Sequence, residues 1–137
     1  MRIFITAVMA LAVAYSAGTA SAATETAKIL CANRFQELIQ KGYELDYIDV
    51  DQASPNRVVH YPGTQMGGVT YLAVASMMDP DGKIRIKVMN GNNHLIAEDT
   101  DSPTAKAENK PLWTEPVNYF IDVLYKNSEY CFAVLNN

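Results

Sequence analysis

One stretch near the end of the chain decides the fold class: Thr114-Glu-Pro-Val-Asn-Tyr-Phe-Ile-Asp-Val-Leu-Tyr-Lys126. At helical spacing, one face of this stretch carries the apolar residues Val117, Phe120, Ile121 and Leu124. Thr114 would cap such a helix, with Glu115 and Pro116 in its first turn. At a spacing of two, strand-forming residues alternate just as regularly: Val117, Tyr119, Ile121, Val123 and Tyr125. We predict a helix followed by a short strand over residues 130–135; the alternative is a hairpin that turns at residues 126–129.

The segments that precede this stretch predict antiparallel strands. Lys83-Ile-Arg-Ile-Lys-Val-Met89 has one aliphatic and one basic face, which is typical of a strand. Asn90-Gly91 follows it and is a strong hairpin signal, so residues 94–98 should form the returning strand. Further strand patterns occupy residues 43–50, 57–61 and 69–77. Residues 99–112 are polar and contain proline, and we expect a long surface loop there.

Residues 24–41 have the periodicity of a helix. Apolar side chains recur three and four residues apart at Ala27, Leu30, Cys31, Phe35, Leu38 and Ile39. Gly42 follows Lys41 and is a natural stop. The predicted fold class is therefore α+β, with an N-terminal helix packed on an antiparallel β-meander and a second helix near the C-terminus.

The first 22 residues have the layout of a signal peptide. The positive Met1-Arg2 precedes an apolar run over residues 3–15, and the small residues Ala20-Ser21-Ala22 fit a peptidase. The apolar run is shorter than the roughly 20 residues that cross a bilayer. We expect cleavage after Ala22, which leaves one domain over residues 23–137 that is periplasmic or secreted and is not inserted in a membrane. The sequence contains no Asn-x-Ser/Thr acceptor, which favours a bacterial origin.

Two cysteines lie near the two ends of the expected mature chain. Cys31 and Cys131 are 100 residues apart, and export would place both in an oxidising compartment. Neither belongs to a Cys-x-x-Cys motif or has a histidine nearby in sequence, which argues against a redox or metal site. We predict a disulfide between them.

Composition and charge exclude several classes of protein. The chain is 49% hydrophobic and 19% charged, which is typical of a globular domain and not of a disordered or fibrous one. Its formal net charge is −4, and removal of Arg2 with the signal would make it −5. A net negative domain has no general attraction for nucleic acid, although it would attract a basic partner.

No motif of an enzyme or of a metal or cofactor site is present. His60 and His94 have no nucleophile motif around them, and Asp79-Pro-Asp-Gly82 predicts a turn rather than a calcium loop. The acidic residues Glu44 and Asp46 could pair across a sheet with a basic row: Lys83, Arg85 and Lys87. We therefore expect no enzyme and no cofactor. The weakest alternative is a small hydrolase that combines one of the histidines with two acidic clusters, which are Glu44, Asp46, Asp49 and Asp51, and Glu98, Asp99 and Asp101.

The candidate binding residues are aromatic or acidic. Trp113, the single tryptophan, ends the expected loop, where it would be either a core anchor or a contact for a partner. Its expected companions are Tyr61, Glu98, Asp99 and Asp101. The leading hypothesis is an exported non-enzymatic binding protein that blocks another protein, as an inhibitor or immunity protein does. The alternative is an envelope domain that binds a glycan, lipid or peptide in a groove.

Overall fold

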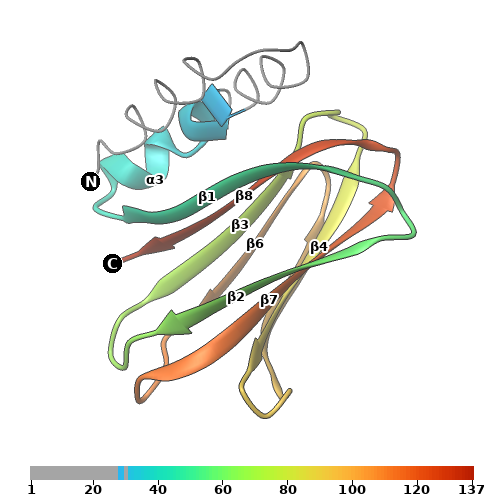
Figure 1. Cartoon of the computed structure of the whole chain (residues 1–137). Helices are drawn as coiled ribbons and strands as arrows, with labels where there is room; N and C mark the ends of the chain where they lie inside the picture. Colours follow the sequence, from blue (N-terminus) through green and yellow to red (C-terminus); the bar gives the residue numbers. More distant parts are fainter. Residues whose placement is uncertain (1–27, 30) are drawn as a thin grey trace, which may run out of the picture.

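Strands dominate the computed structural model, which describes residues 28, 29 and 31–137 (Figure 1). In chain order the regular elements are α3 (Gln36–Gln40), β1 (Glu44–Ala53), β2 (Val58–Gln65), β3 (Tyr71–Met77), β4 (Lys83–Asn90), β5 (Leu95–Asp101), β6 (Thr104–Asn109), β7 (Glu115–Tyr125) and β8 (Ser128–Asn136). Residues 31–34 are also helical. None of the helices in this part of the chain is long and apolar enough to cross a membrane.

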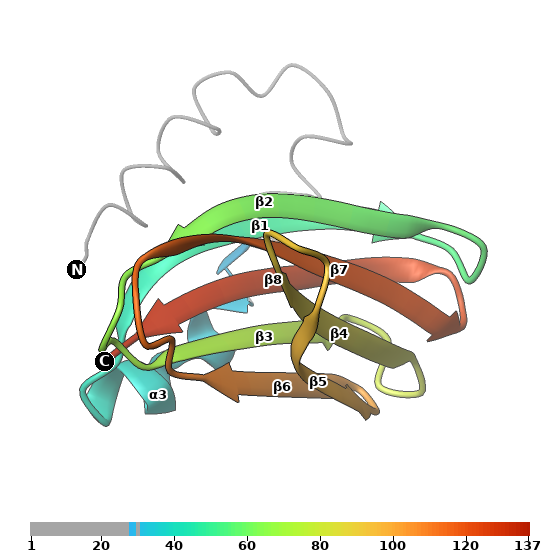
Figure 2. The same ribbon diagram turned by 90° about the horizontal axis from the view of Figure 1, so that it is seen from below.

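The strands form two antiparallel sheets packed face to face (Figures 1 and 2). The first sheet has the order β1-β8-β3-β6 and the second the order β2-β7-β4-β5. Each early strand pairs with a late one, β1 with β8, β2 with β7, β3 with β6 and β4 with β5. This is the strand order of an eight-stranded jelly roll, a sandwich in which one long antiparallel ribbon is folded over on itself.

The predicted α+β fold class is wrong, and residues 114–126 show why. They form β7, whose side chains at Val117, Tyr119, Ile121 and Val123 are buried between the sheets. Because β7 pairs with β2 on one side and β4 on the other, its backbone hydrogen bonds are satisfied within the sheet. The helix predicted there would have turned Phe120 and Leu124 inward, whereas Leu124 is exposed.

Two further predictions are corrected. Residues 99–112 are not a long loop, because they contain the end of β5 and all of β6, whose Ala105 and Ala107 are buried. The sheets are not a meander, because among the described strands only β4 and β5 are neighbours in both sequence and sheet. That pair is the hairpin predicted from Asn90-Gly91, and it is confirmed.

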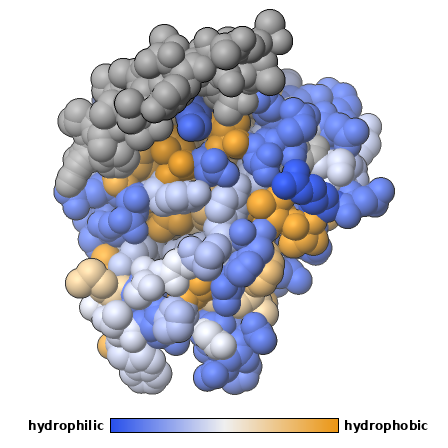
Figure 3. All heavy atoms as spheres, viewed as in Figure 1, coloured by the Kyte–Doolittle hydropathy of each residue, from blue (hydrophilic) through white to orange (hydrophobic). Residues whose placement is uncertain are grey.

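The described residues form two apolar clusters, one on each face of the first sheet. The larger cluster lies between the sheets, and the smaller one lies between the outer face of the first sheet and the helical segment, where Phe35 packs. The predicted helix over residues 24–41 is thus reduced to short pieces, and residues 24–27 and 30 lie outside the described residues. In the view of Figure 3, polar side chains cover most of the surface and apolar ones appear in separate patches.

The predicted disulfide is confirmed and lies in the smaller cluster. Cys31 of the helical segment is bonded to Cys131 of β8, with their Cα atoms 5.9 Å apart. A bridge that closes a loop of 100 residues stabilises a domain by about 4–5 kcal/mol in the chain-entropy model. Such a bond is typical of an oxidising, extracellular-type environment. The predicted signal peptide lies outside the described residues.

Candidate ligand groove

A groove of about 340 Å³ opens between the edge strands β1 and β2. We call it the β1/β2 groove; its lining is Asp46, Tyr47, Tyr61, Pro62, Gly63, Thr64, Tyr119, Phe132 and Val134. β1 and β2 belong to different sheets and meet at one lateral edge of the sandwich. The lining therefore comes from both sheets, and Phe132 and Val134 of β8 together with Tyr119 of β7 form its inner side.

A β-bulge in β1 brings two neighbouring side chains into this groove. The register with β8 shifts between Leu45 and Tyr47, so Asp46 has no partner in the ladder. Successive side chains of a regular strand point to opposite faces, yet Asp46 and Tyr47 both line the groove. Bulges re-aim side chains in this way and are frequent beside functional sites. The irregularity thus places a carboxylate next to an aromatic ring.

The inner surface of the groove is aromatic. The Tyr61 and Phe132 rings stack with their centroids 4.5 Å apart. The Tyr47 and Tyr119 rings lie 6.1 and 5.4 Å from the Phe132 ring and are inclined to it by 58° and 54°. Phe132 and Tyr119 are buried, whereas 45% of Tyr47 is exposed. The rings therefore pack together, and among them Tyr47 alone presents a large exposed surface.

The tyrosine hydroxyls are held by a hydrogen-bonded chain. The Tyr61 hydroxyl donates to Asp49 Oδ2 at 2.7 Å, so the Tyr130 hydroxyl, 2.8 Å from it, donates to the Tyr61 oxygen. Burial, together with these hydrogen bonds, raises the pKa of Tyr61 far above its ordinary value near 10. Burial also raises the pKa of Tyr130 to about 12. Both rings stay neutral phenols at physiological pH.

A second network fixes the Tyr119 ring. The Gln65 side chain is fully buried and donates to the Tyr119 hydroxyl at 3.0 Å. Gln65 also exchanges two hydrogen bonds with Asn109, of 3.1 and 2.7 Å. Gly63 leaves room beside the ring, since a Cβ there would lie 3.3 Å from Tyr119 Cε2. The Tyr119 ring is thus held in place without a ligand.

The structure separates the residues that the sequence grouped as a binding surface. Tyr61 lines the groove, whereas Glu98, Asp99 and Asp101 lie on β5 at the opposite lateral edge. There the backbone N–H of Lys106 donates to Asp99 Oδ2 at 2.8 Å and that of Ser102 to Asp101 Oδ1 at 2.8 Å. These two carboxylates therefore support the β5–β6 connection.

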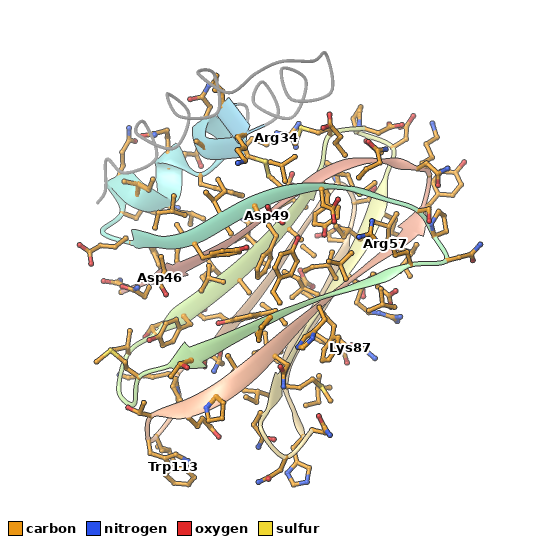
Figure 4. All side chains as sticks on the ribbon, in the orientation of Figure 1. Arg34, Asp46, Asp49, Arg57, Lys87 and Trp113 are labelled. Atoms are coloured by element: carbon orange, nitrogen blue, oxygen red, sulfur yellow. A yellow bond between two sulfur atoms is a disulfide. The ribbon has the colours of Figure 1, made fainter. Side chains whose placement is uncertain are left out.

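Trp113 lies at one end of the sandwich and points away from it (Figure 4). It is 63% exposed and is therefore not a core anchor, and its neighbour Leu112 is 85% exposed. The loop that carries them is firmly held, because Gly68 N donates to Pro111 O at 2.8 Å and a Cβ on Gly67 would lie 2.6 Å from Trp113 Cα. With the exposed Met66 they form an apolar tip, defined by Met66, Leu112 and Trp113.

The predicted charge ladder between Glu44 or Asp46 and the basic row is wrong. The acids lie in the first sheet and the basic row in the second, so the two sets cannot face each other as cross-strand pairs. Arg85 instead pairs with Asp122 of β7, with 2.6 Å between Nη2 and Oδ2.

The two histidines lie away from the groove. His60 stacks on Phe120, with centroids 4.9 Å apart, and its Nε2 lies 2.6 Å from Asn118 Oδ1. His94 is exposed after the β4–β5 turn, where its backbone N–H donates to Asn90 Oδ1. Within the described residues, no three His, Cys, Asp or Glu side chains gather as metal ligands.

Sequence reasoning missed most of the groove. Among its key residues it singled out only Tyr61, and it missed Tyr47, Tyr119 and Phe132 as ligand-facing groups. Asp46 was considered for the charge ladder and among the acids of the hydrolase alternative, and not as a ligand-binding group. Because a regular alternation puts Asp46 and Tyr47 on opposite faces, only the bulge brings them together, and no turn or glycine signal marks it.

No family model and no curated protein matches this sequence. Among solved structures, a Yersinia pseudotuberculosis-derived mitogen is 14% identical, with a TM-score of 0.38 over 57% of this chain and 84% of its own. The CBM22-1 xylan-binding domain of Xyn10C from Paenibacillus barcinonensis is 8% identical, with a TM-score of 0.32 over 70% of this chain and 84% of its own. The CBM22-1 and GH10 modules of xylanase 10B from Clostridium thermocellum are 14% identical, with a TM-score of 0.31 over 53% of this chain and 17% of theirs. Similarity at this level carries no argument about function.

Proposed function

We propose that this protein is a small non-enzymatic binding protein, periplasmic or secreted, whose ligand site is the β1/β2 groove. The bulge at Asp46 carries the proposal, because it makes the Asp46 carboxylate and the Tyr47 ring line the same groove. Ligand sites are concave and mostly apolar, with a few polar groups that orient the ligand. The groove has this composition, and its tyrosines are fixed in advance by hydrogen bonds.

The groove supports binding better than it supports catalysis. Its tyrosines are held in their neutral form, and its lining offers the Asp46 carboxylate with no histidine, cysteine or lysine beside it to complete a catalytic pair. Both histidines lie outside it, which supports binding over a hydrolase that would combine a histidine with the groove carboxylate.

The test is a nuclear magnetic resonance titration with a panel of small ligands: tetramethylammonium, a lysine tripeptide and xylohexaose. At least one ligand should shift the ring signals of the groove tyrosines. Tyr47→Ala should abolish this binding, and Tyr125→Ala, which removes a comparably exposed tyrosine at the far end of β7, should leave it unchanged. Equal binding by both variants would refute the groove as the site.

A second candidate function uses the apolar tip to bind another protein, as an inhibitor or immunity protein would. Exposed tryptophans are frequent hot spots of interfaces, and this one stands on a loop held tightly by Gly67 and Pro111. A partner captured from periplasm or culture fluid by the wild-type protein should be lost with Trp113→Ala and retained with Tyr47→Ala. The reverse pattern would assign the partner to the groove.

A further inference from the structure

We infer that the β1/β2 groove binds an organic cation, an ammonium group carried on an alkyl chain; this inference rests on the proposed function. Three features of the groove support it: an unpaired carboxylate at the rim, tilted aromatic rings on the inside, and no basic side chain in the lining.

The charge of the groove is negative. Asp46 makes no hydrogen bond or ion pair within the described part of the chain, and it lies close enough to Tyr119 to raise the pKa of that phenol further. The second nearby carboxylate, Asp49, accepts a hydrogen bond from the Tyr61 hydroxyl (Figure 4 shows both acids on β1). A site with carboxylates and no compensating base attracts cations and repels anions.

The aromatic rings form one inclined cluster at the inner side of the groove. Tyr47 and Tyr119 are inclined to Phe132 by more than 50°, and Tyr47 is inclined to Tyr61 by 62°. The rings contact one another, and only Tyr47, which is 45% exposed, offers an accessible face. A cation within about 6 Å of the centroid of such a ring is attracted by the ring quadrupole. The exposed face of Tyr47 beside the Asp46 carboxylate is therefore where an ammonium group would bind.

The same geometry disfavours a sugar. A sugar ring packs flat against a broadly exposed aromatic face, and here only Tyr47 offers such a face. Its partners Tyr61, Tyr119 and Phe132 are 9%, 4% and 0% exposed. The volume of about 340 Å³ is at the lower end of the range for ligand sites, and it suits a compact group.

An alkylammonium group could come from a free small amine or from a lysine side chain of a partner protein. Both sources present the same chemistry to Asp46 and the rings. Tetramethylammonium represents the free cation, a lysine tripeptide represents the side chain, and xylohexaose is the uncharged comparison.

The experiment measures the affinity of the full-length folded protein for each probe by the shifts of its tyrosine ring signals. At least one of the two cations should bind, and its affinity should fall as salt is raised, because the carboxylate at the rim is exposed. Asp46→Asn should weaken this binding by about tenfold, as expected for loss of one charged partner. Glu98→Gln makes the same chemical change on the opposite edge and should leave the affinity unchanged.

The outcomes separate the inference from the proposed function. Binding of xylohexaose in the groove without binding of either cation would overturn the inference that the ligand is a cation, and the proposed binding function would stand. Failure of all three probes to shift the ring signals would count against both. Tighter binding of the tripeptide than of tetramethylammonium would support a partner's lysine, and the opposite order would support a free amine.

Discussion

The two lateral edges of the sandwich are built differently, although each is formed by one strand from each sheet. At the closed edge, residues 102–103 are the whole connection between β5 and β6, and the Ser102 hydroxyl donates to the Gly82 carbonyl. At the open edge, β1 and β2 diverge from their connecting turn (Figure 1), and tyrosine side chains line the space between them. The polar groups of the closed edge therefore hold two strands together, whereas the open edge leaves the Asp46 carboxylate and the Tyr47 ring exposed.

The open edge is also protected against pairing with a further strand. Edge strands expose backbone N–H and C=O groups that could template another chain. Pro62 removes one donor from β2, and the bulge at Asp46 interrupts the regular edge of β1. This edge is therefore suited to a ligand that contacts side chains rather than to an added strand.

The largest expected effect comes from the inner wall of the open edge. Phe132→Ala removes a fully buried ring that contacts three tyrosine rings, and we expect a loss of about 4 kcal/mol of stability in urea unfolding. Phe120→Ala removes a half-buried ring from the outer face of the second sheet and should cost about 1 kcal/mol. Similar losses for the two variants would mean that the groove rings contribute little to the core.

The disulfide should matter more to the open edge than to the closed one. It fastens the helical segment to β8, which pairs with β1. The double variant Cys31→Ser and Cys131→Ser should lose about 3 kcal/mol, which is below the chain-entropy value and within the range of about 2–5 kcal/mol for loss of a native bridge. Hydrogen exchange should then accelerate more in β1 than in β5. Uniform acceleration over both strands would show that the bridge stabilises the whole domain without preference.

Alkaline pH should destabilise the protein through the open edge. Tyr61 and Tyr130 have pKa values above those of unfolded tyrosine, so their contribution to stability is complete below pH about 10 and is lost as pH rises toward 12. The midpoint of urea unfolding should fall over this range, and Tyr61→Phe should make the decline shallower. A midpoint that stays constant to pH 12 would contradict the burial of these phenols.

The parts of the fold that were predictable depend on local signals. The turn at Asn90-Gly91 sets the β4–β5 hairpin with residues close in sequence, and a chain with two cysteines leaves one possible pairing. The choice at residues 114–126 was not local. The apolar residues fitted both the helical spacing and the two-residue spacing of a strand. The segment is a strand because β2 and β4, which are distant in sequence, pair with it on both sides.

The sequence pattern did not predict strand β6 or the bulge at Asp46, and each failure has a physical reason. In β6, alanines occupy the buried positions Ala105 and Ala107, so its alternation carries little hydrophobic contrast and predicted a loop. At Asp46, the bulge reverses the facing that strict alternation predicts, and it arises from the pairing of β1 with β8 rather than from a local residue preference. The candidate site therefore depends on the one step of β1 that sequence periodicity describes wrongly.

The smallest effect separates the two edges most directly, because it compares one carboxylate on each. Asp99→Ala at the closed edge leaves the backbone N–H of Lys106 without its acceptor and should cost about 1 kcal/mol in urea unfolding. Asp46→Ala at the open edge removes no hydrogen bond and should change stability by less than about 0.5 kcal/mol. A carboxylate whose removal costs binding but not stability belongs to a site rather than to the scaffold. A large loss for Asp46→Ala would instead make the bulge a structural requirement of β1.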